Sequence, residues 1–360
     1  MTLNVSGILY AMSNKLGDEK MNTIELAKTL IQIPSESGQE QKIGRILVER
    51  LKKNFDVRTQ PVGDRFNVLA TKGKPQLILT THIDTVPKQL EIKEDKEWLY
   101  GRGACDTKGL MAAMICAAEQ AVQEGITNFG LLFDVGEETD FAGVKKATTL
   151  VNPNYVIVGE PTAFTMRIGQ KGLLGFKLSC KGVSAPGATP EKGISAIERL
   201  IDNLERIRKI PLPNDEKLGE SKLNIGMIQG GSAVNVVPDY AEATVEVRTT
   251  ESNKTFLKKI RNELRFADIE ITCNFDSVLL QDLKWTEAFN LNPTISKGFN
   301  ELYFWSQKSK AIVFGPGDYA YAHGDQEKIR KKDILKGQKI YLDMIRRLTK
   351  ENTYKLTQTR

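Results

Sequence analysis

The chain has 360 residues, of which 40% are hydrophobic and 27% are charged, so it is long enough for two globular domains. Its 51 Lys and Arg exceed its 45 Asp and Glu by six, and because these charges are mixed along the chain, neither a nucleic acid nor a membrane surface is expected as a partner. No apolar run approaches the roughly 20 residues of a membrane span, and the four cysteines form no CxxC pair, which favours a soluble protein of the reducing cytoplasm.

The first segment has no basic region before its short apolar patch, which argues against a signal peptide and leaves Met1 and Met21 open as translation starts. After a helical pattern at 22–33, apolar runs alternate with helical patterns, as in a sheet covered by helices. The runs at 76–81, 129–135 and 154–159 are apolar like strands buried on both faces. A helix is predicted at 107–125, and a last strand and helix at 310–317 and 331–348.

The segment 168–276 has a different order of elements. Strand-like runs lie at 172–182, 222–231, 240–250 and 269–275, and helical patterns lie at 190–209 and 253–267. This βαββαβ order predicts a ferredoxin-like domain inserted into the larger one. Apolar residues that recur at helical spacing are assigned to its core, namely Ile197, Leu200, Ile201, Leu204 and Ile207.

Polar side chains with metal-binding atoms follow the predicted strands of the larger domain, and one more, Asp106, precedes the predicted helix at 107–125. In open α/β sheets, ligands bind beyond the carboxyl ends of the strands, so these side chains are expected to meet. Imidazole and carboxylate groups together suit zinc, cobalt or manganese. The candidates are His82, Asp84, Asp106, Glu137, Glu138, Glu160 and His323.

Each candidate also has a purely structural explanation. A single histidine after a strand is often a hydrogen-bonded structural residue, and Asp106 could cap the helix that follows it. Glu137 and Glu138 could stabilise a helix N-terminus, and Glu160 precedes a proline in an ordinary turn. These explanations are independent of one another, and none predicts why every strand end carries ligand-type residues. We therefore favour a metal site.

The spacing of the candidates suggests which of them bind metal, orient a ligand or transfer protons. Residues two apart in a strand face the same side, so the Asp84 carboxylate is expected to accept the second ring proton of His82. Glu137 and Glu138 are neighbours and point in different directions, so one can bind metal while the other transfers protons. This division of roles is what metal-assisted hydrolysis requires.

Seven motifs carry a resemblance to a known family. In chain order they are "IQIPSESGQE", "THIDTVP", "GRGACDTKG", "GEE", "GEPT", "GGSAVNVVPDYAEATVEVR" and "FGPGDYAYAH". In this order, and with the inserted segment, the chain resembles the M20-type metallopeptidases and aminoacylases. The resemblance implies an α/β fold with a mixed-sheet, zinc-aminopeptidase-like catalytic domain (1–167 and 277–360) and a ferredoxin-like lid or dimerisation domain (168–276).

The resemblance also implies a role for each matching residue. Asp106 would bridge two divalent ions, zinc or cobalt. Glu137 would be the general base that takes a proton from the attacking water and returns it to the leaving amine, and Asp84 would assist by orienting a ligand. The other ligands would be His82 and Glu160 at the first ion, and Glu138 and His323 at the second.

The chain departs from the family pattern at Pro186, where the family has a histidine that reaches into the partner subunit's site and polarises the scissile carbonyl. Proline donates no hydrogen bond, so this contribution is missing or comes from another group. By the same resemblance, Asn235 and Arg248 are candidates for binding the substrate carboxylate, although a salt-bridged Arg248 fits the sequence equally well. A homodimer through 168–276 is the assembly that the resemblance suggests.

We expect a cytoplasmic hydrolase of small N-acyl amino acids, most similar to the acetylornithine deacetylases of arginine biosynthesis and the related deacylases of lysine biosynthesis. One alternative is an M20-type dipeptidase, tripeptidase or carboxypeptidase. Another is a non-catalytic metal-binding member of the family, which Pro186 favours and the intact Glu137 opposes.

Overall fold

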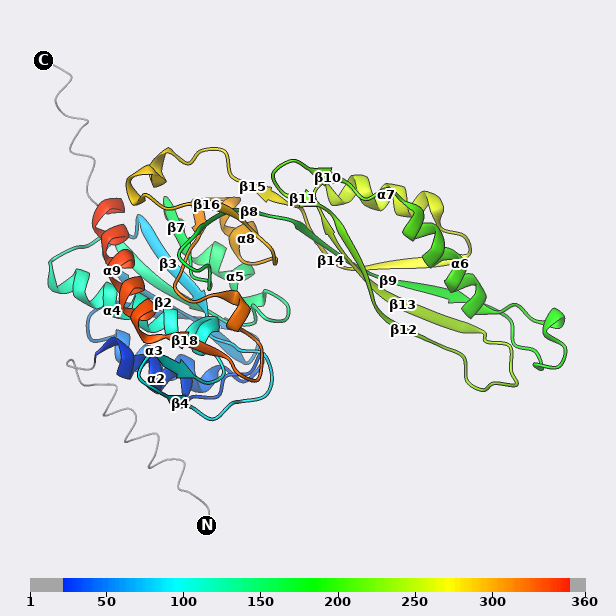
Figure 1. Cartoon of the computed structure of the whole chain (residues 1–360), viewed down its shortest axis with the longest axis horizontal. Helices are drawn as coiled ribbons and strands as arrows, with labels where there is room; N and C mark the ends of the chain where they lie inside the picture. The colour runs from blue at the N-terminus through cyan, green and yellow to red at the C-terminus, as the bar shows by residue number, and fades with distance from the viewer. Residues whose placement is uncertain (1–21, 350–360) are drawn as a thin grey trace, which may run out of the picture. The chain divides into compact units, whose positions relative to one another are not determined.

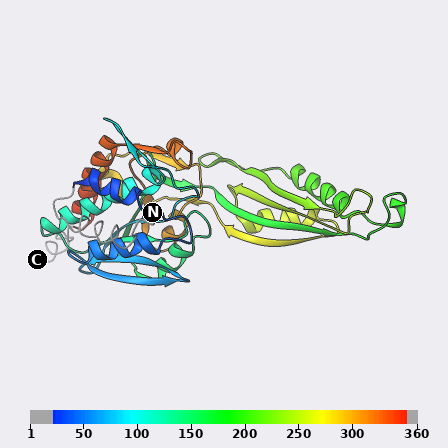
Figure 2. The same ribbon diagram turned by 90° about the horizontal axis from the view of Figure 1, so that it is seen from below.

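The computed structural model describes residues 22–349 and divides the chain into two units (Figures 1 and 2). Within the described residues, unit 1 comprises 22–167, 282–294 and 304–349, and unit 2 comprises Ile168–Gln281 and Ile295–Tyr303. The alternative translation starts, Met1 and Met21, lie outside the described residues.

Unit 2 is larger than the predicted insertion of 168–276. Residues 277–281 join it because Val278 and Leu279 pair with Gln170 and Gly169 in an antiparallel ladder. Residues 295–303 join it as well, and the rings of Phe299 and Tyr303 both lie 5.3 Å from the ring of Phe275. Aromatic packing and strand pairing therefore continue beyond residue 276, the predicted end of the insertion.

The largest sheet is mixed and belongs mostly to unit 1, although its residues 168–170, 278–279 and 295–296 are part of unit 2. Its strands are β1 (Asp56–Val62), β2 (Arg65–Lys72), β3 (Leu77–His82), β6 (Phe129–Asp134), β7 (Tyr155–Val158), β8 (Met166–Gln170), β15 (Val278–Leu279), β16 (Pro293–Ser296) and β17 (Lys310–Val313). The order is β1-β2-β6-β3-β7-β17-β8-β15, with β16 beside β8. β6, β3, β7 and β17 are parallel, whereas β1 and β2 are antiparallel to their neighbours. Every residue of β3 and β6 is buried, which explains their continuous apolar sequences.

Helices cover both faces of this sheet. They are α2 (Thr23–Ile31), α3 (Gln41–Leu51), α4 (Gly109–Gln123), α5 (Ala142–Leu150) and α9 (Lys331–Leu348). α2, α4 and α9 pack on one another. Gly44 of α3 lies against the ring of Phe66, whereas Asn67, which faces the other side of β2, donates to the carbonyl of Gly143 in α5 at 2.9 Å. α3 and α5 therefore lie on opposite faces, and the predicted α/β architecture is confirmed.

Shorter elements complete this part of the chain. They are β4 (Lys93–Glu94), β5 (Trp98–Tyr100) and β18 (Lys328–Arg330), which form a small sheet, the π-helical turn η1 (Ala104–Lys108), the 3-10 turns η3 (Lys284–Phe289) and η4 (Tyr319–Tyr321), and α8 (Leu302–Ser306). Within residues 22–349, no helix is both long and apolar enough to cross a membrane. All four cysteines are free thiols.

Unit 2 contains a four-stranded antiparallel sheet with helices packed against it. Its elements are β9 (Gly172–Lys181), η2 (Pro190–Lys192), α6 (Ala196–Lys209), β10 (Asn214–Asp215), β11 (Gly219–Glu220), β12 (Lys222–Gly230), β13 (Tyr240–Thr249), α7 (Asn253–Glu263) and β14 (Ala267–Phe275). The sheet order is β12-β13-β9-β14, and Phe176, Leu200 and Phe256 belong to its core. The helix predicted from residue 190 begins only at Ala196, because the Ser195 side chain accepts the Glu198 N–H as an N-cap.

Candidate metal centre

Five predicted metal ligands meet at the carboxyl ends of the parallel strands of unit 1. His82 is the last residue of β3, while Glu138 and Glu160 follow β6 and β7. Asp106 lies in η1, directly before α4, and His323 follows η4. The parallel strands bring their ends to one edge of the sheet, so residues far apart in sequence become neighbours.

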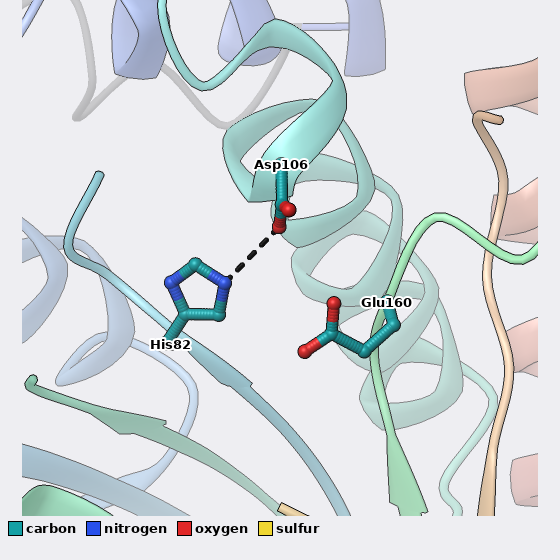
Figure 3. Close-up of side chains that lie close together, drawn as sticks. All are labelled: His82, Asp106 and Glu160. Atoms are coloured by element: carbon teal, nitrogen blue, oxygen red, sulfur yellow. Dashed lines mark hydrogen bonds and ion pairs between the residues drawn. The ribbon is translucent and has the colours of Figure 1, made fainter. Parts of the chain in front are cut away.

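The Asp106 carboxylate occupies the centre of the cluster. Its Oδ1 lies 3.1 Å from Nε2 of His82, and its Oδ2 lies 3.2 Å from Nε2 of His323 (Figure 3 shows the first contact). Nε2 of His323 also lies 3.0 Å from Oε1 of Glu138. The ligand atoms form two groups that share Asp106, and within each group they lie within 4.8 Å of one another. The groups are His82, Asp106 and Glu160, and Asp106, Glu138 and His323.

The other ring nitrogen of His82 faces the backbone of Asp84. Nδ1 lies 2.9 Å from the Asp84 carbonyl oxygen and 3.5 Å from its carboxylate oxygen Oδ1. The prediction that the carboxylate is the main acceptor is therefore corrected in favour of the carbonyl. A carbonyl can only accept, so Nδ1 carries the proton and Nε2 keeps its lone pair for a metal ion.

The Asp84 carboxylate instead fixes the turn that follows β6. It accepts the backbone N–H groups of Gly136, Glu137 and Glu138 at 3.0, 3.1 and 3.2 Å. It also accepts the hydroxyl of Ser37 at 2.7 Å. Asp84 thus ties the end of β3 to the residues predicted as general base and second-site ligand.

The charges of the cluster fit divalent cations. Burial raises the pKa of Glu137 well above its ordinary value, and the nearby Glu160 carboxylate raises it further. Burial and the Asp106 carboxylate raise the pKa of Glu160 in the same way. Bound cations would relieve this repulsion, and imidazole nitrogens with carboxylate oxygens are ligands that zinc, cobalt and manganese accept. The residues therefore fit two divalent ions.

The predicted substrate-binding residues belong to unit 2. Arg248 lies in β13, where its Nε donates to Oε1 of Glu246 at 2.8 Å, so the salt-bridged alternative is the one present in the structure. Asn235 lies in an exposed turn after β12. Next to it, Pro186 forms an isolated antiparallel bridge with Val236. A role for Asn235 and Arg248 in substrate binding stays a prediction.

Two buried residues near the cluster received no role from the sequence. Glu327 accepts the backbone N–H of Asp106 at 3.1 Å, and Arg102 donates to Glu327 at 2.6 Å. Arg102 lies inside the motif "GRGACDTKG", and Glu327 lies four residues after His323. Their closeness in sequence to the predicted ligands is the one feature that could identify them. Neither hydrophobic periodicity nor placement at a strand end distinguishes them from other charged residues.

An α/β unit whose strand ends carry two overlapping groups of histidine and carboxylate ligands defines a metal-dependent hydrolase. The model of peptidase family M20/M25/M40 matches residues 78–347, and the chain belongs to this family. The family predicted from the motifs is confirmed, and membership implies divalent metal ions.

Relatives and solved structures agree with this assignment. A probable carboxypeptidase of Aspergillus clavatus is 32% identical over 348 residues, which cover 85% of this chain and 84% of the relative. A peptidase M20 domain-containing protein of Schizosaccharomyces pombe is 32% identical over 341 residues, covering 90% and 84%. A tripeptidase of Staphylococcus aureus has a similar fold, with a TM-score of 0.77, 23% identity and coverage of 91% of this chain and 97% of that chain. An M20 family metallo-carboxypeptidase of Sulfolobus solfataricus also has a similar fold, with a TM-score of 0.74 and 16% identity. The match covers 91% of this chain and 100% of that chain.

Proposed function

We propose that this protein is a metallo-carboxypeptidase, which hydrolyses the amide bond that precedes a C-terminal amino acid. The observation that carries the hydrolase assignment is the Asp106 carboxylate, whose two oxygens face two different histidines at 3.1 and 3.2 Å. The carboxypeptidase assignment is supported by relatives at 32% identity that carry this name.

Two divalent ions, zinc or cobalt, would be held by the two ligand groups. When bound, such ions lower the pKa of water and stabilise negative charge on the amide oxygen. Glu137 takes the proton of the attacking water and delivers it to the leaving amine. Asp84 holds Glu137 in place through its backbone N–H at 3.1 Å.

The acetylornithine deacetylase that we expected from the sequence is a narrower form of the same chemistry. In an N-acyl amino acid, as in a peptide, the scissile amide is followed by an amino acid with a free carboxylate. The two activities differ in whether the acyl side is a small acid or a peptide. The names of the relatives favour the peptide, so acetylornithine deacetylation becomes a competing outcome of the assay.

The second unit supports a further part of this proposal. Its βαββαβ elements form a sheet in the order β12-β13-β9-β14, and we assign it as a ferredoxin-like lid or dimerisation domain. Asn235 and Arg248 of this unit are the candidates for binding the substrate carboxylate. We also place the protein in the cytoplasm, since its four cysteines are free.

The assignment can be tested with a panel of substrates and cobalt-loaded protein. The panel contains N-blocked dipeptides, the same dipeptides with an amidated C-terminus, free dipeptides, N-acetylornithine, N-acetylcitrulline and N-succinyl-diaminopimelate. A carboxypeptidase cleaves the N-blocked dipeptides and fails on the amidated ones, because it needs the C-terminal carboxylate and no free amine. The Glu137→Gln variant gives the background rate for every substrate.

The other outcomes separate the alternatives. Cleavage restricted to free dipeptides would indicate a dipeptidase, and cleavage restricted to the N-acyl amino acids would restore the deacylase. Binding of two ions without any cleavage above the Glu137→Gln background would identify the non-catalytic member that Pro186 allows.

A further inference from the structure

A buried ion pair contacts the backbone that carries the bridging aspartate. Nη1 of Arg102 lies 2.6 Å from Oε2 of Glu327, and the two side chains are 3% and 0% exposed. The other carboxylate oxygen, Oε1, accepts the backbone N–H groups of Cys105 and Asp106, both at 3.1 Å. One oxygen of Glu327 thus neutralises the arginine, and the other holds the two peptide groups that lead into Asp106.

The same arginine reaches the loop of the second-site histidine. Nη1 of Arg102 lies 3.4 Å from the carbonyl oxygen of Gly324, the residue after His323, and its Nε donates to the carbonyl of Lys88 at 3.2 Å. His323 is exposed, and its backbone φ of 64° lies in the left-handed region, which non-glycine residues rarely adopt. This loop therefore depends on fixed neighbours to keep the imidazole in place, and Arg102 is one of them.

The two ion sites differ in how their ligands are supported. Two first-site ligands, His82 and Glu160, are not shared with the second site. His82 ends β3 and Glu160 follows β7, so the parallel pairing of these two strands fixes both. At the second site, His323 comes from a loop outside the sheet. Buried ion pairs are weak general stabilisers, because the loss of hydration offsets much of their attraction. The location of the Arg102–Glu327 pair is therefore better explained by a role in positioning metal ligands than by a contribution to the stability of the fold.

We propose that Arg102 and Glu327 are positioning residues of the metal centre: they hold the Asp106 backbone and the His323 loop at the separation that the second ion requires. This inference rests on the proposed two-ion centre. Neither residue is assigned contact with the substrate. Loss of either residue should therefore weaken the second ion more than the first. The second ion depends on both the Asp106 backbone and the His323 loop, whereas the first depends only on Asp106.

The test uses the Glu327→Gln variant of the full chain, freed of metal and titrated with Co²⁺. Glutamine retains an oxygen for the two backbone N–H groups but leaves the buried Arg102 without its counter-charge. Substitution of residues that orient metal ligands typically lowers affinity about 10–100-fold. We expect a loss of this size for the second Co²⁺ and a change of at most about threefold for the first, a split that follows from the unequal support of the two sites.

A second ion pair of unit 1, between a buried arginine and a partly buried glutamate, provides the control. Arg50 of α3 lies 2.7 Å from Glu119 of α4, and the two side chains are 5% and 17% exposed. Glu119 lies toward the C-terminal end of α4, whereas Asp106 lies before its N-terminal end. Glu119→Gln likewise removes the counter-charge of a buried arginine, so it should lower the melting temperature of the metal-free protein without changing either Co²⁺ affinity.

Calorimetric titration and the visible absorption of bound Co²⁺ give the two affinities, and melting of the metal-free protein gives the stability. Equal affinities in Glu327→Gln and wild type would overturn the inference, as would an equal loss in Glu119→Gln. If Glu327→Gln does not fold, Arg102→Lys replaces it: the charge remains, the contact with Gly324 is lost, and only the second affinity should fall. If wild-type protein binds fewer than two Co²⁺, the proposed two-ion centre is wrong. If all variants bind two Co²⁺ as tightly as wild type, the two-ion centre stands and only the positioning role is wrong.

Discussion

Glu137 is the residue whose substitution separates proton transfer from metal binding. It lies next to Glu138, a proposed ligand, and its backbone N–H is bound by the Asp84 carboxylate, but it belongs to neither candidate ligand group. Glu137→Gln keeps the shape of the side chain and removes the base. A positioned general base contributes roughly 10²–10⁴-fold to rate, so we expect kcat to fall by this factor while both Co²⁺ affinities stay within about twofold.

Two neighbouring residues control this experiment. Glu138→Gln should instead weaken the second Co²⁺, since Glu138 shares its ligand group with His323. Asp140→Asn changes an exposed carboxylate in the same turn and should alter neither rate nor affinity. A Glu137→Gln variant that keeps its kcat, or that loses metal as Glu138→Gln does, would contradict the general-base assignment.

At the scale of elements, Asp84 connects β3 to the turn after β6, and Asp84→Asn tests which of its atoms matters. The carbonyl that meets His82 is unchanged in this variant, so the first Co²⁺ should bind with an affinity close to that of wild type. The turn loses part of its anchor, because an amide nitrogen cannot accept a backbone N–H. We expect kcat/KM to fall about 10–100-fold, as for other residues that orient a metal centre.

Ser37→Ala is the graded comparison for Asp84→Asn, because it removes only one of the four hydrogen bonds to this carboxylate. It should have a smaller effect on kcat/KM. A large loss of the first Co²⁺ in Asp84→Asn would show that the carboxylate, and not the carbonyl, orients His82. Titration calorimetry and steady-state kinetics on the same preparations decide between these outcomes.

β12 gives a prediction about assembly. It is an edge strand of the unit 2 sheet, and Met227 and Ile228 in it are 67% and 59% exposed. An edge strand with exposed apolar side chains can pair with another copy of the chain. We therefore expect a homodimer that becomes monomeric when Met227 and Ile228 are both changed to Lys. Light scattering after size-exclusion chromatography measures this, with Phe266→Lys, an exposed site in the α7–β14 connection, as the control. A monomeric wild-type protein would exclude the dimer.

The same elements show which parts of the fold the sequence can predict. The sequence predicts β3, β6 and β7 because strands buried on both faces have continuous apolar sequences, and the parallel pairing of these strands places the ligand candidates. β1 was missed because most of its residues are exposed, so it has no apolar pattern. The helix at 190–209 was predicted six residues too long at its start, because helical periodicity does not reveal a separate 3-10 turn.

The site shows the same limit at the level of single hydrogen bonds. Residue types near the strand ends predicted seven candidates, and the family resemblance selected from them the five ligands that the structure brings together. They did not predict that the Asp84 carbonyl, rather than its carboxylate, meets His82, because that choice depends on side-chain orientation. Arg102 and Glu327 were missed for a related reason: they act through backbone groups, which have no sequence signature.

At the scale of the whole molecule, the two units are stabilised by different features, so we expect them to unfold separately. The proposed metal ligands all belong to unit 1, and unit 2 has its own core, in which Phe256 is fully buried. A ligand that binds only the native state stabilises it by about 2.7 kcal/mol at a hundred times its dissociation constant. We therefore expect two thermal transitions, of which Co²⁺ raises one by several degrees and leaves the other unchanged.

The transition of unit 2 is identified by Phe256→Ala. Truncation of a buried phenylalanine costs about 3–5 kcal/mol, which should lower the Co²⁺-insensitive transition by roughly 10–20 °C and leave the Co²⁺-sensitive one in place. Phe266→Ala is the control: this ring is 77% exposed, and loss of its contact with the Arg199 guanidinium, 4.7 Å from the ring centroid, should shift the Co²⁺-insensitive transition far less. Differential scanning calorimetry with Co²⁺ and with a chelator gives both values. A single transition that Co²⁺ and Phe256→Ala both move would mean that the two units unfold as one cooperative body, and that a substitution in unit 2 can weaken metal binding in unit 1 through global stability alone.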